Sequence, residues 1–337
     1  MSILVIGGSS FIGAYTVQAF LDAGYEVITT GRNDRFESHY AKLGVSYRSF
    51  DLADEQGIKQ LPCEDVEGVV LLAALLPANS QSDLKNEDNA WEYLEVNSVG
   101  TARLLEYCRR TRIKRLITTA SYADVQCSWS SDSAVREDWA KNFEFAGDHA
   151  AYVISKNAAN DICTYYNSQH GMKNVIFRLP PVYGVGPHGS LMVNGVRRKS
   201  GTDIFIERAK LGEPIFVYGD GSVKRDIVYV KDVAQAFVDA MESDDAMGLY
   251  NIGSGVASSF MEQAQAISRV FAGDNGVSVV ENDRTKENGL TGYSFDISKA
   301  QTDFGYAPRY AEFEALMRDW KKEEDRGVYP ALFQVEP

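Results

Sequence analysis

The N-terminal stretch MSILVIGGSSFIGAYTVQAFLDAG, residues 1–24, decides the fold. Its aliphatic run ILVI at 3–6 is typical of a buried parallel strand and leads directly into the glycine segment GGSSFIG at 7–13. The residues that follow repeat apolar side chains at helical spacing and end at Gly24, a natural left-handed end for a helix. The stretch therefore predicts a strand, a tight turn and a helix.

Strand and helix continue to alternate through the first half of the chain. Further strands are predicted within 25–31, 44–52, 66–76 and 114–121, and residues 90–112 are long enough for a crossover helix. Repeated units of this kind imply a doubly wound parallel sheet of the Rossmann type, an α/β fold that binds ligands at the carboxyl ends of its strands.

Composition limits the possible partners. The chain has 337 residues, 45% of them hydrophobic, and a net charge of −13. That charge argues against nucleic acid or an anionic membrane as the main partner, whereas a small anionic ligand remains possible. Four scattered cysteines without a CxxC pair indicate reduced thiols and no metal site, and no export signal or membrane span is visible, so a cytoplasmic location is expected.

The glycine segment is the first predicted binding site. Gly7 permits the sharp turn and Gly13 lets helix and strand approach, while Ser10 occupies the place of a middle glycine. Ser10, Phe11 and Ile12 open the helix, whose free N–H groups and positive dipole end suit a pyrophosphate. The segment predicts a bound dinucleotide.

The end of the second predicted strand bears on which dinucleotide is bound. An acidic residue there accepts hydrogen bonds from ribose hydroxyls, whereas an arginine suits a 2′-phosphate. The stretch TTGRND at 29–34 has Gly31 at the acidic position and Arg32 next to it, which favours NADP and leaves NAD possible. In the alternative interpretation, Arg32 is merely solvated and Asp34 reaches the ribose.

The second predicted site lies in AYVISKNAANDI, residues 151–162. Tyr152 and Lys156 are four residues apart and share one face of a helix. A neighbouring ammonium stabilises a phenolate, so the pair is a candidate acid/base unit, although such pairs are common on ordinary helix surfaces. Ser121 ends the strand predicted within 114–121, where its hydroxyl is placed to hold a substrate oxygen.

These motifs together resemble the extended short-chain dehydrogenase/reductase family, in its nucleotide-sugar epimerase/dehydratase branch. The matching segments, in family order, are GGSSFIG at 7–13, DL at 51–52, LLAA at 71–74, NSVGT at 97–101, TTAS at 118–121, Tyr152 with Lys156, RLPPVYG at 178–184, VYGDGSVKRDIVYVKDVA at 217–234 and FDISKAQTDFGYAP at 295–308.

The resemblance implies a role for each matching residue. Tyr152 would be the catalytic acid/base, Lys156 would lower its pKa and hold the nicotinamide ribose, and Ser121 would position the reacting oxygen. The implied cofactor site also includes Asp51, Leu52, Ala73 and Asn97. The implied substrate is a nucleotide sugar whose diphosphate is bound by Arg225, with Arg284 as a second contact.

The resemblance also implies two parts of the chain. Residues 1–177 would form the dinucleotide-binding domain, to which a segment near 226–252 returns, and residues 178–337 would form mainly a smaller α/β substrate lobe. Within that lobe we expect a surface excursion at 184–195 near the substrate, a hairpin-like aromatic stretch and a helix capped by Asp232. Arg225 has an alternative role, a salt bridge to Asp226 or a neighbour.

Departures from the family pattern narrow the reaction. Pro181 stands where relatives carry an asparagine, so one contact to the substrate phosphate is lost or replaced. Tyr122 and Ala123 follow Ser121 where dehydratases carry Asp-Glu, and the first acid is Asp124, which disfavours dehydration.

Several functions remain open at the level of sequence. The first is an epimerase that passes through a transient keto-sugar by hydride transfer, and the second is an NADPH-dependent reductase of a keto-sugar nucleotide. A reductase of another small carbonyl and a non-catalytic dinucleotide sensor are further alternatives. By the same resemblance a homodimer would form through helices at about 98–112 and 150–168.

Overall fold

The computed structural model describes residues 2–77, 89–147, 149–187, 190–193, 196–287 and 289–334. For residues 190–193, 196 and 197 only the backbone is described.

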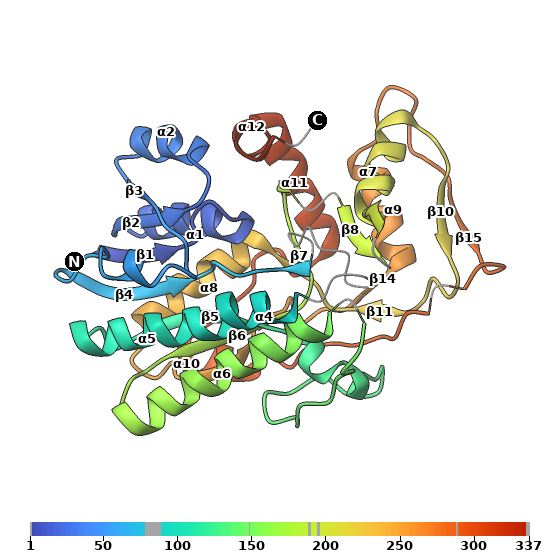
Figure 1. Ribbon diagram of the computed structural model, residues 1–337. Coiled ribbons are helices and arrows are strands. Elements are labelled where there is room, and N and C mark those ends of the chain that lie inside the picture. Colours follow the sequence, from blue (N-terminus) through green and yellow to red (C-terminus); the bar gives the residue numbers. More distant parts are fainter. Residues whose placement is uncertain are drawn as a thin grey trace.

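Seven parallel strands form the central sheet (Figure 1). They are β1 (Ser2–Ile6), β2 (Glu26–Gly31), β3 (Ser46–Ser49), β4 (Val66–Leu71), β5 (Leu116–Ser121), β6 (Val175–Leu179) and β13 (Gly248–Asn251). Their order across the sheet is β13-β6-β5-β4-β1-β2-β3, and every neighbouring pair is parallel. This arrangement confirms the predicted Rossmann-type sheet. The strand order reverses between β1 and β4, and in sheets of this kind the binding crevice lies at the carboxyl ends of the two strands where the order reverses.

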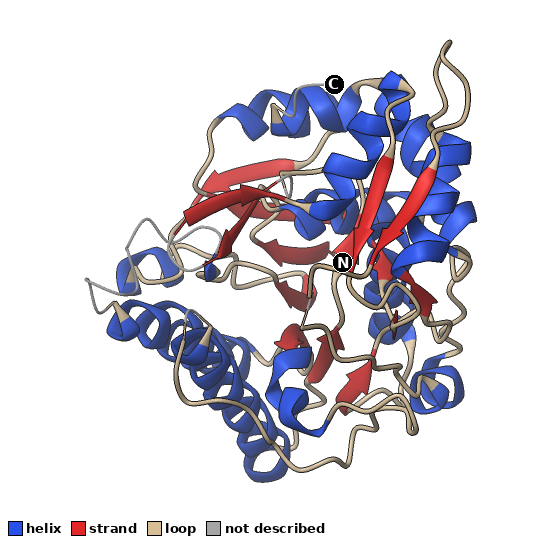
Figure 2. Cartoon of the chain, turned by 90° about the vertical axis from the view of Figure 1, so that its right-hand side faces the viewer, coloured by secondary structure: helices blue, strands red, loops and turns tan. Residues whose placement is uncertain are grey.

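Helices cover both faces of the sheet (Figures 1 and 2). One face carries α5 (Gly100–Thr111) and α6 (Ala150–His170), and the other carries α1 (Phe11–Asp22) and α8 (Val230–Glu242). Because both faces are covered, the strands can be apolar throughout, and all five residues of β1 are buried.

The remaining helices connect these layers or belong to the smaller lobe. They are α2 (Arg35–Lys42), α3 (Glu55–Ile58), α4 (Ala90–Tyr93), the π-helical segment η2 (Leu94–Val99), the 3₁₀ segment η3 (Tyr122–Ser128), α7 (Gly201–Leu211), α9 (Phe260–Val270), α10 (Ser298–Phe304), α11 (Phe313–Arg326) and α12 (Val328–Phe333). Among the described residues, no helix combines the length and apolar character needed to cross a bilayer.

The smaller lobe is built from short strand pairs and three helices, α7, α9 and α11, which pack against one another. Its strands are β7 (Val182–Tyr183), β8 (Ser190–Val193), β9 (Val196–Lys199), β10 (Ile215–Tyr218), β11 (Lys224–Arg225), β12 (Val228–Tyr229), β14 (Ser258–Ser259) and β15 (Val280–Asp283). The prediction of a hairpin-like aromatic stretch is wrong, because β10 pairs in parallel with β15 and β11 pairs with β14. The strand β13, in contrast, joins the central sheet. The division of the chain into two domains stays a prediction.

Two helix predictions need correction. Helix α8 begins at Val230 after Tyr229, so Asp232 is not its N-cap. The Asp232 carboxylate instead accepts hydrogen bonds from the backbone N–H groups of Arg309 and Tyr310, at 2.8 and 3.1 Å. The predicted crossover helix is continuous in sequence but changes to a π-helical turn at residues 94–99.

Candidate active site

Gly7 sits where the chain leaves β1 and needs to be glycine for two reasons. Its φ of +98° lies in the left-handed region that side chains rarely adopt. A Cβ at this position would also lie 2.5 Å from the backbone nitrogen of Ala73, which follows β4. Gly7 therefore permits the close approach of the β1 and β4 ends, where the crevice opens.

Ser10 is the N-cap of α1. Its φ of −86° and ψ of 166° are ordinary extended backbone, so the position does not require glycine. Its hydroxyl oxygen accepts a hydrogen bond from the N–H of Gly13 at 3.1 Å. Ser10 therefore stabilises the helix start, a role the sequence analysis did not assign to it.

The start of α1 fits a dinucleotide pyrophosphate. A Cβ on Gly13 would lie 2.1 Å from the Gly7 carbonyl oxygen, so the turn is a cradle that larger residues would fill. Within the described residues the N–H of Ile12 has no acceptor, which leaves it available to an anion at the helix end. The ring of Phe11 turns the other way and packs edge-on against Tyr15 and Phe333, so only its backbone faces the cradle.

The residues predicted to surround the adenosine lie at the ends of β2 and β3. Arg32 directly follows Gly31 and is exposed, and its guanidinium lies 3.6 Å from the carboxylate of Asp51. Asp51 also accepts a hydrogen bond from the N–H of Ala53 at 3.0 Å. The neighbouring Leu52 is buried, so its side chain belongs to the core.

Asn97 joins three elements beside the crevice. Its side-chain oxygen accepts the N–H of Leu75 at 2.8 Å, and its amide donates to the Leu75 carbonyl at 3.1 Å and to the Ser155 hydroxyl at 3.0 Å. Asn97 is almost fully buried in the π-helical turn η2. It thus ties the segment after β4 to helix α6, and π-helical turns are frequent at functional sites.

Tyr152 and Lys156 lie on the first two turns of α6, as the spacing predicts. Burial raises the pKa of Tyr152, and the neighbouring phenols of Tyr122 and Tyr93 raise it further. Burial lowers the pKa of Lys156 to about 8, and its Nζ lies 3.5 Å from the hydroxyl of Thr119 on β5. A buried lysine with a lowered pKa is typical of functional sites, and within the described residues no hydrogen bond joins it to Tyr152.

Ser121 ends β5 and caps the 3₁₀ segment that follows. Its hydroxyl oxygen accepts the N–H of Ala123 at 3.2 Å, and its side chain is buried. Asp124 is also buried and forms a two-pronged ion pair with Arg178, at 2.8 and 3.1 Å. Burial raises the pKa of Asp124, while Arg178 acts in the opposite direction. Both bonds end on Oδ2, whereas Oδ1 is buried without a hydrogen-bond partner among the described residues.

Arg225 lies against the rings of Trp129 and Tyr293, which with Tyr122 form an aromatic cluster. It does not form the alternative ion pair with Asp226. Its guanidinium carbon is 5.9 Å from the ring centre of Trp129 and 5.6 Å from that of Tyr293. Its Nε donates to the carbonyl of Thr291 at 2.8 Å. Asp226 is fully buried and binds Ser254 and nearby backbone N–H groups, so it is not the partner of Arg225.

Arg284 is exposed beyond β15 and contacts Asn282 at 3.3 Å. In the described part of the chain no contact joins it to Arg225 or to the aromatic cluster. Part of the predicted excursion at 184–195 falls on residues 188–189 and 194–195, which lie outside the described residues.

The aromatic cluster was missed by the sequence reasoning. Tyr122 stacks on Trp129 with ring centres 5.2 Å apart and planes 4° apart, and Tyr293 lies 4.5 Å from Trp129 and 5.6 Å from Tyr122. One signal was available, because Tyr122 directly follows the predicted catalytic serine. Trp129 follows in the same segment, Tyr293 is remote in sequence, and neither carries a motif.

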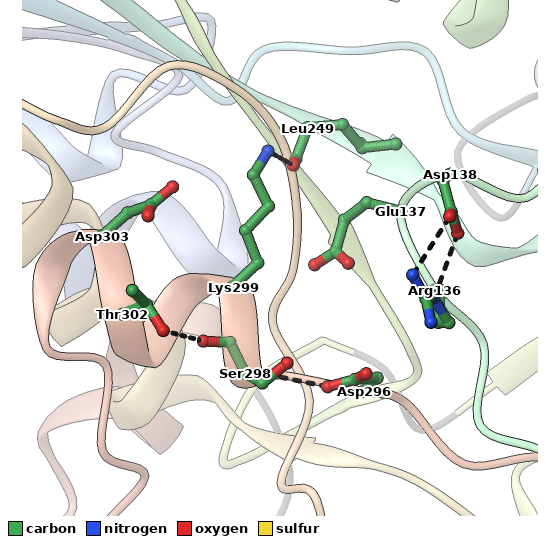
Figure 3. Close-up of a pocket in the computed structure, with 9 residues that line it drawn as sticks. All are labelled: Arg136, Glu137, Asp138, Leu249, Asp296, Ser298, Lys299, Thr302 and Asp303. Carbon is green, nitrogen blue, oxygen red and sulfur yellow. Dashed lines mark hydrogen bonds and ion pairs between the residues drawn. The ribbon is translucent and has the colours of Figure 1, made fainter.

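A cavity of about 650 Å³ lies elsewhere, beside the edge strand β13 (Figure 3). Lys299 donates to the Leu249 carbonyl at 2.7 Å, and Glu137 accepts the N–H of Asn251 at 2.9 Å. Arg136 pairs with Asp138 at 3.1 Å. Lys299 and Glu137 form hydrogen bonds with the backbone of the edge strand, and Arg136 and Asp138 pair with each other. None of the predicted site residues lines the cavity.

Comparison with known proteins agrees with this geometry. UDP-glucose 4-epimerase of Halalkalibacterium halodurans is 25% identical over 97% of each chain. UDP-glucuronic acid decarboxylase 6 of Arabidopsis thaliana is 27% identical over 94% of this chain and 87% of its own. The solved structure of Thermus thermophilus UDP-glucose 4-epimerase in complex with NAD superimposes with a TM-score of 0.72, at 26% identity over 97% of this chain and all of that one. The model of the NAD dependent epimerase/dehydratase family matches residues 3–253, and the chain therefore belongs to that family of enzymes.

Proposed function

We propose that this protein is a nucleotide-sugar epimerase in which Tyr152 is the acid/base and Lys156 supports it. The observation that carries this proposal is the buried Lys156, with a pKa of about 8, one helical turn from Tyr152 at the carboxyl end of the parallel sheet. Relatives with solved structures include epimerases whose complexes contain NAD or a UDP-sugar, which supports the same substrate class here.

The proton chemistry falls to Tyr152. Its raised pKa keeps the phenol neutral near pH 7, so a nearby cation must stabilise the anion before it acts as a base. Lys156 is protonated below about pH 8, and its position one turn further along the same helix supports the proposal that it supplies that charge. Tyr152 then takes the proton from the sugar hydroxyl and later returns it to the same oxygen.

The dinucleotide would be held by the Gly7 turn, the start of α1 and the residues that end β2, β3 and β4. When bound, it supplies reversible hydride acceptance and donation for the sugar carbon. The sequence preference for NADP has no support among the relatives, whose solved complexes contain NAD. We retain Arg32 as the residue that would recognise a 2′-phosphate. The Asp51 carboxylate would compete with that phosphate for the Arg32 guanidinium.

A second candidate is a keto-sugar-nucleotide reductase, favoured by one observation. No acid ends β2, where an acid would bind the ribose of NAD, and Arg32 stands in its neighbourhood. Dehydration has less support, because Asp124 is bound to Arg178 in the core and is not free to protonate a leaving hydroxyl.

We further propose that the substrate diphosphate binds Arg225. Its Nε donates to the Thr291 carbonyl, while aromatic rings hold the guanidinium plane and leave its remaining N–H groups for an anion.

A homodimer is proposed as well, through α5, α6 and their neighbours. Exposed apolar residues gather on these elements, namely Trp91, Leu94, Val99, Ile154 and Tyr165.

The test is a reaction of the purified protein with UDP-glucose, UDP-N-acetylglucosamine and UDP-glucuronic acid, with NAD or NADPH added. NMR of the product distinguishes an inverted hydroxyl, the epimerase result, from a reduced keto-sugar or a lost carboxyl group. We expect an epimer from at least one sugar, and none from Tyr152→Phe with its dinucleotide content unchanged. Epimerisation by Tyr152→Phe at the wild-type rate would refute the assigned acid/base.

A further inference from the structure

The carboxyl end of β2 has no room for the acidic side chain that binds ribose in many dinucleotide folds. Gly31 ends this strand and is buried. A Cβ added to it would lie 2.1 Å from the hydroxyl oxygen of Ser9 and 2.6 Å from that of Tyr47. Gly31 does not have a positive φ, so space and not backbone conformation excludes a side chain. Two hydroxyl groups therefore occupy the place of the missing acid.

The two hydroxyl groups come from different elements that meet at this edge of the sheet. Ser9 lies in the turn between β1 and α1, and Tyr47 lies on β3. The strands β1 and β3 are the two neighbours of β2 in the sheet. Both side chains are partly exposed, as contact with a ligand requires.

The ring of Tyr47 is held in one direction. It stacks on Tyr40 of α2, with ring centres 5.7 Å apart and planes 20° apart, and its hydroxyl donates to the Asn33 carbonyl at 2.9 Å. Tyr40 donates in turn to the carbonyl of Gly8, next to Ser9, at 2.6 Å. Burial raises the pKa of Tyr47, while a hydrogen bond with Ser9 acts in the opposite direction. The turn and β3 thus bring the two hydroxyl groups together.

Two hydroxyl groups differ from a carboxylate in what they can bind. A carboxylate accepts hydrogen bonds from ribose hydroxyls and repels a 2′-phosphate. A hydroxyl group accepts a hydrogen bond from a ribose hydroxyl and can also donate one to a phosphate oxygen. The next residue, Arg32, is exposed and adds a positive charge at the same edge. A site built in this way excludes neither form of the dinucleotide.

We propose that the hydroxyl groups of Ser9 and Tyr47 replace the missing carboxylate as contacts of the adenosine ribose, and that the protein therefore binds both NAD and NADP. This inference rests on the proposed function only in that a dinucleotide is bound. It adds two residues to Arg32, which would contact only a 2′-phosphate. Ser9 and Tyr47 bind and orient the cofactor, and no bond forms or breaks at their oxygens.

Titration calorimetry with NADH and NADPH tests the two contacts. Ser9→Ala keeps the Cβ, and Tyr47→Phe keeps the ring and its stack, so each variant loses only a hydroxyl group. We expect each variant to bind both dinucleotides about 2- to 10-fold more weakly than the wild type, the effect of one neutral hydrogen bond. Ser38→Ala removes an exposed hydroxyl group from α2 and should leave both affinities unchanged.

An exchange of residues tests the selectivity. Gly31→Asp combined with Ser9→Gly supplies a carboxylate and removes the serine oxygen and Cβ with which it would collide. We expect this double variant to bind NADH within about 10-fold of the wild type and NADPH about 100-fold more weakly, because the carboxylate repels the 2′-phosphate. Its melting temperature shows that it is folded.

Three binding results would overturn this inference. They are wild-type affinities in both Ser9→Ala and Tyr47→Phe, wild-type binding of NADPH by the folded double variant, and a wild type that prefers one dinucleotide by more than about 1,000-fold. Turnover is a separate measurement. If the wild type binds both dinucleotides but epimerises no UDP-sugar, the proposed function fails and this inference stands. A wild type that binds neither dinucleotide overturns both.

Discussion

At the scale of single residues, the site depends on charges that are buried before any ligand arrives. Lys156 is the clearest case, because burial lowers its pKa from an ordinary 10.5 to about 8. Between these two values the Lys156 side chain binds a proton in the unfolded chain and not in the folded one, so its contribution to the stability of the fold rises with pH in that window. Below about pH 8 both states are protonated, and the buried charge is a fixed cost.

This linkage predicts the behaviour of Lys156→Met. The free energy of unfolding of the wild type, minus that of the variant, should increase from about pH 8 to about pH 10.5. Urea unfolding at a series of pH values measures the difference. The same subtraction with Lys114→Met, at an exposed position, is the control for the loss of a lysine. A flat line for Lys156→Met would mean that its ammonium is as well solvated as an exposed one.

Arg32 gives a second prediction at this scale. If it binds a 2′-phosphate, Arg32→Ala should weaken NADPH about 10-fold or more and change NADH binding little, because a charged hydrogen bond is lost. Titration calorimetry with each cofactor measures both affinities. Asp51→Asn is the informative partner variant, since it frees Arg32 from its 3.6 Å contact and should favour NADPH. An equal loss for both cofactors in Arg32→Ala would remove the argument for NADP.

At the scale of elements, the turn between β1 and α1 shows which glycines are required. Gly7 and Gly24 both have positive φ, at +98° and +87°. Only Gly7 is crowded, since a Cβ there would lie 2.5 Å from the Ala73 backbone, whereas nothing lies within 4 Å of one at Gly24. Gly24→Ala should therefore cost about 1–2 kcal/mol of unfolding free energy, the price of the left-handed conformation.

Gly7→Ala should lower the unfolding free energy by the same amount as Gly24→Ala and by about 1–3 kcal/mol more, because β1 and β4 must move apart. Chemical denaturation of both variants gives the two free energies, and retained dinucleotide shows whether the crevice survives. Similar losses for the two variants would show that crowding at Gly7 is relieved without cost.

The elements could be predicted from sequence where the local pattern is strong. The apolar runs predicted the first five strands of the sheet, and the i, i+4 spacing predicted that Tyr152 and Lys156 share a helix. The helix start at Asp232 could not be predicted, because that carboxylate is used by the backbone of residues 309 and 310, which are distant in sequence. The aromatic cluster was not predicted because Tyr293 is distant in sequence from Tyr122 and Trp129 and meets them only in the folded chain.

At the scale of the whole molecule, exposed apolar side chains lie on α4 and α6, two elements of the proposed dimer interface. Trp91 on α4 is 66% exposed, and Ile154 on α6 is 36% exposed. Helices α4 and α6 contact each other, so these side chains lie on neighbouring elements of one layer (Figure 1). A contiguous exposed apolar surface is typical of an interface, and an isologous pair of such faces would close a dimer.

The proposed dimer predicts a particle of twice the 37.3 kDa chain mass in light scattering. Trp91→Glu combined with Ile154→Glu should give the mass of a single chain, because opposed carboxylates would be buried without partners. Val277→Glu combined with Val279→Glu is the matched control, since both valines are 62% exposed just before β15. Neither pair should lower the melting temperature of the monomer, because the altered side chains are exposed. A wild type of single-chain mass, or a double variant of Trp91 and Ile154 that keeps the dimer mass, would place any interface elsewhere.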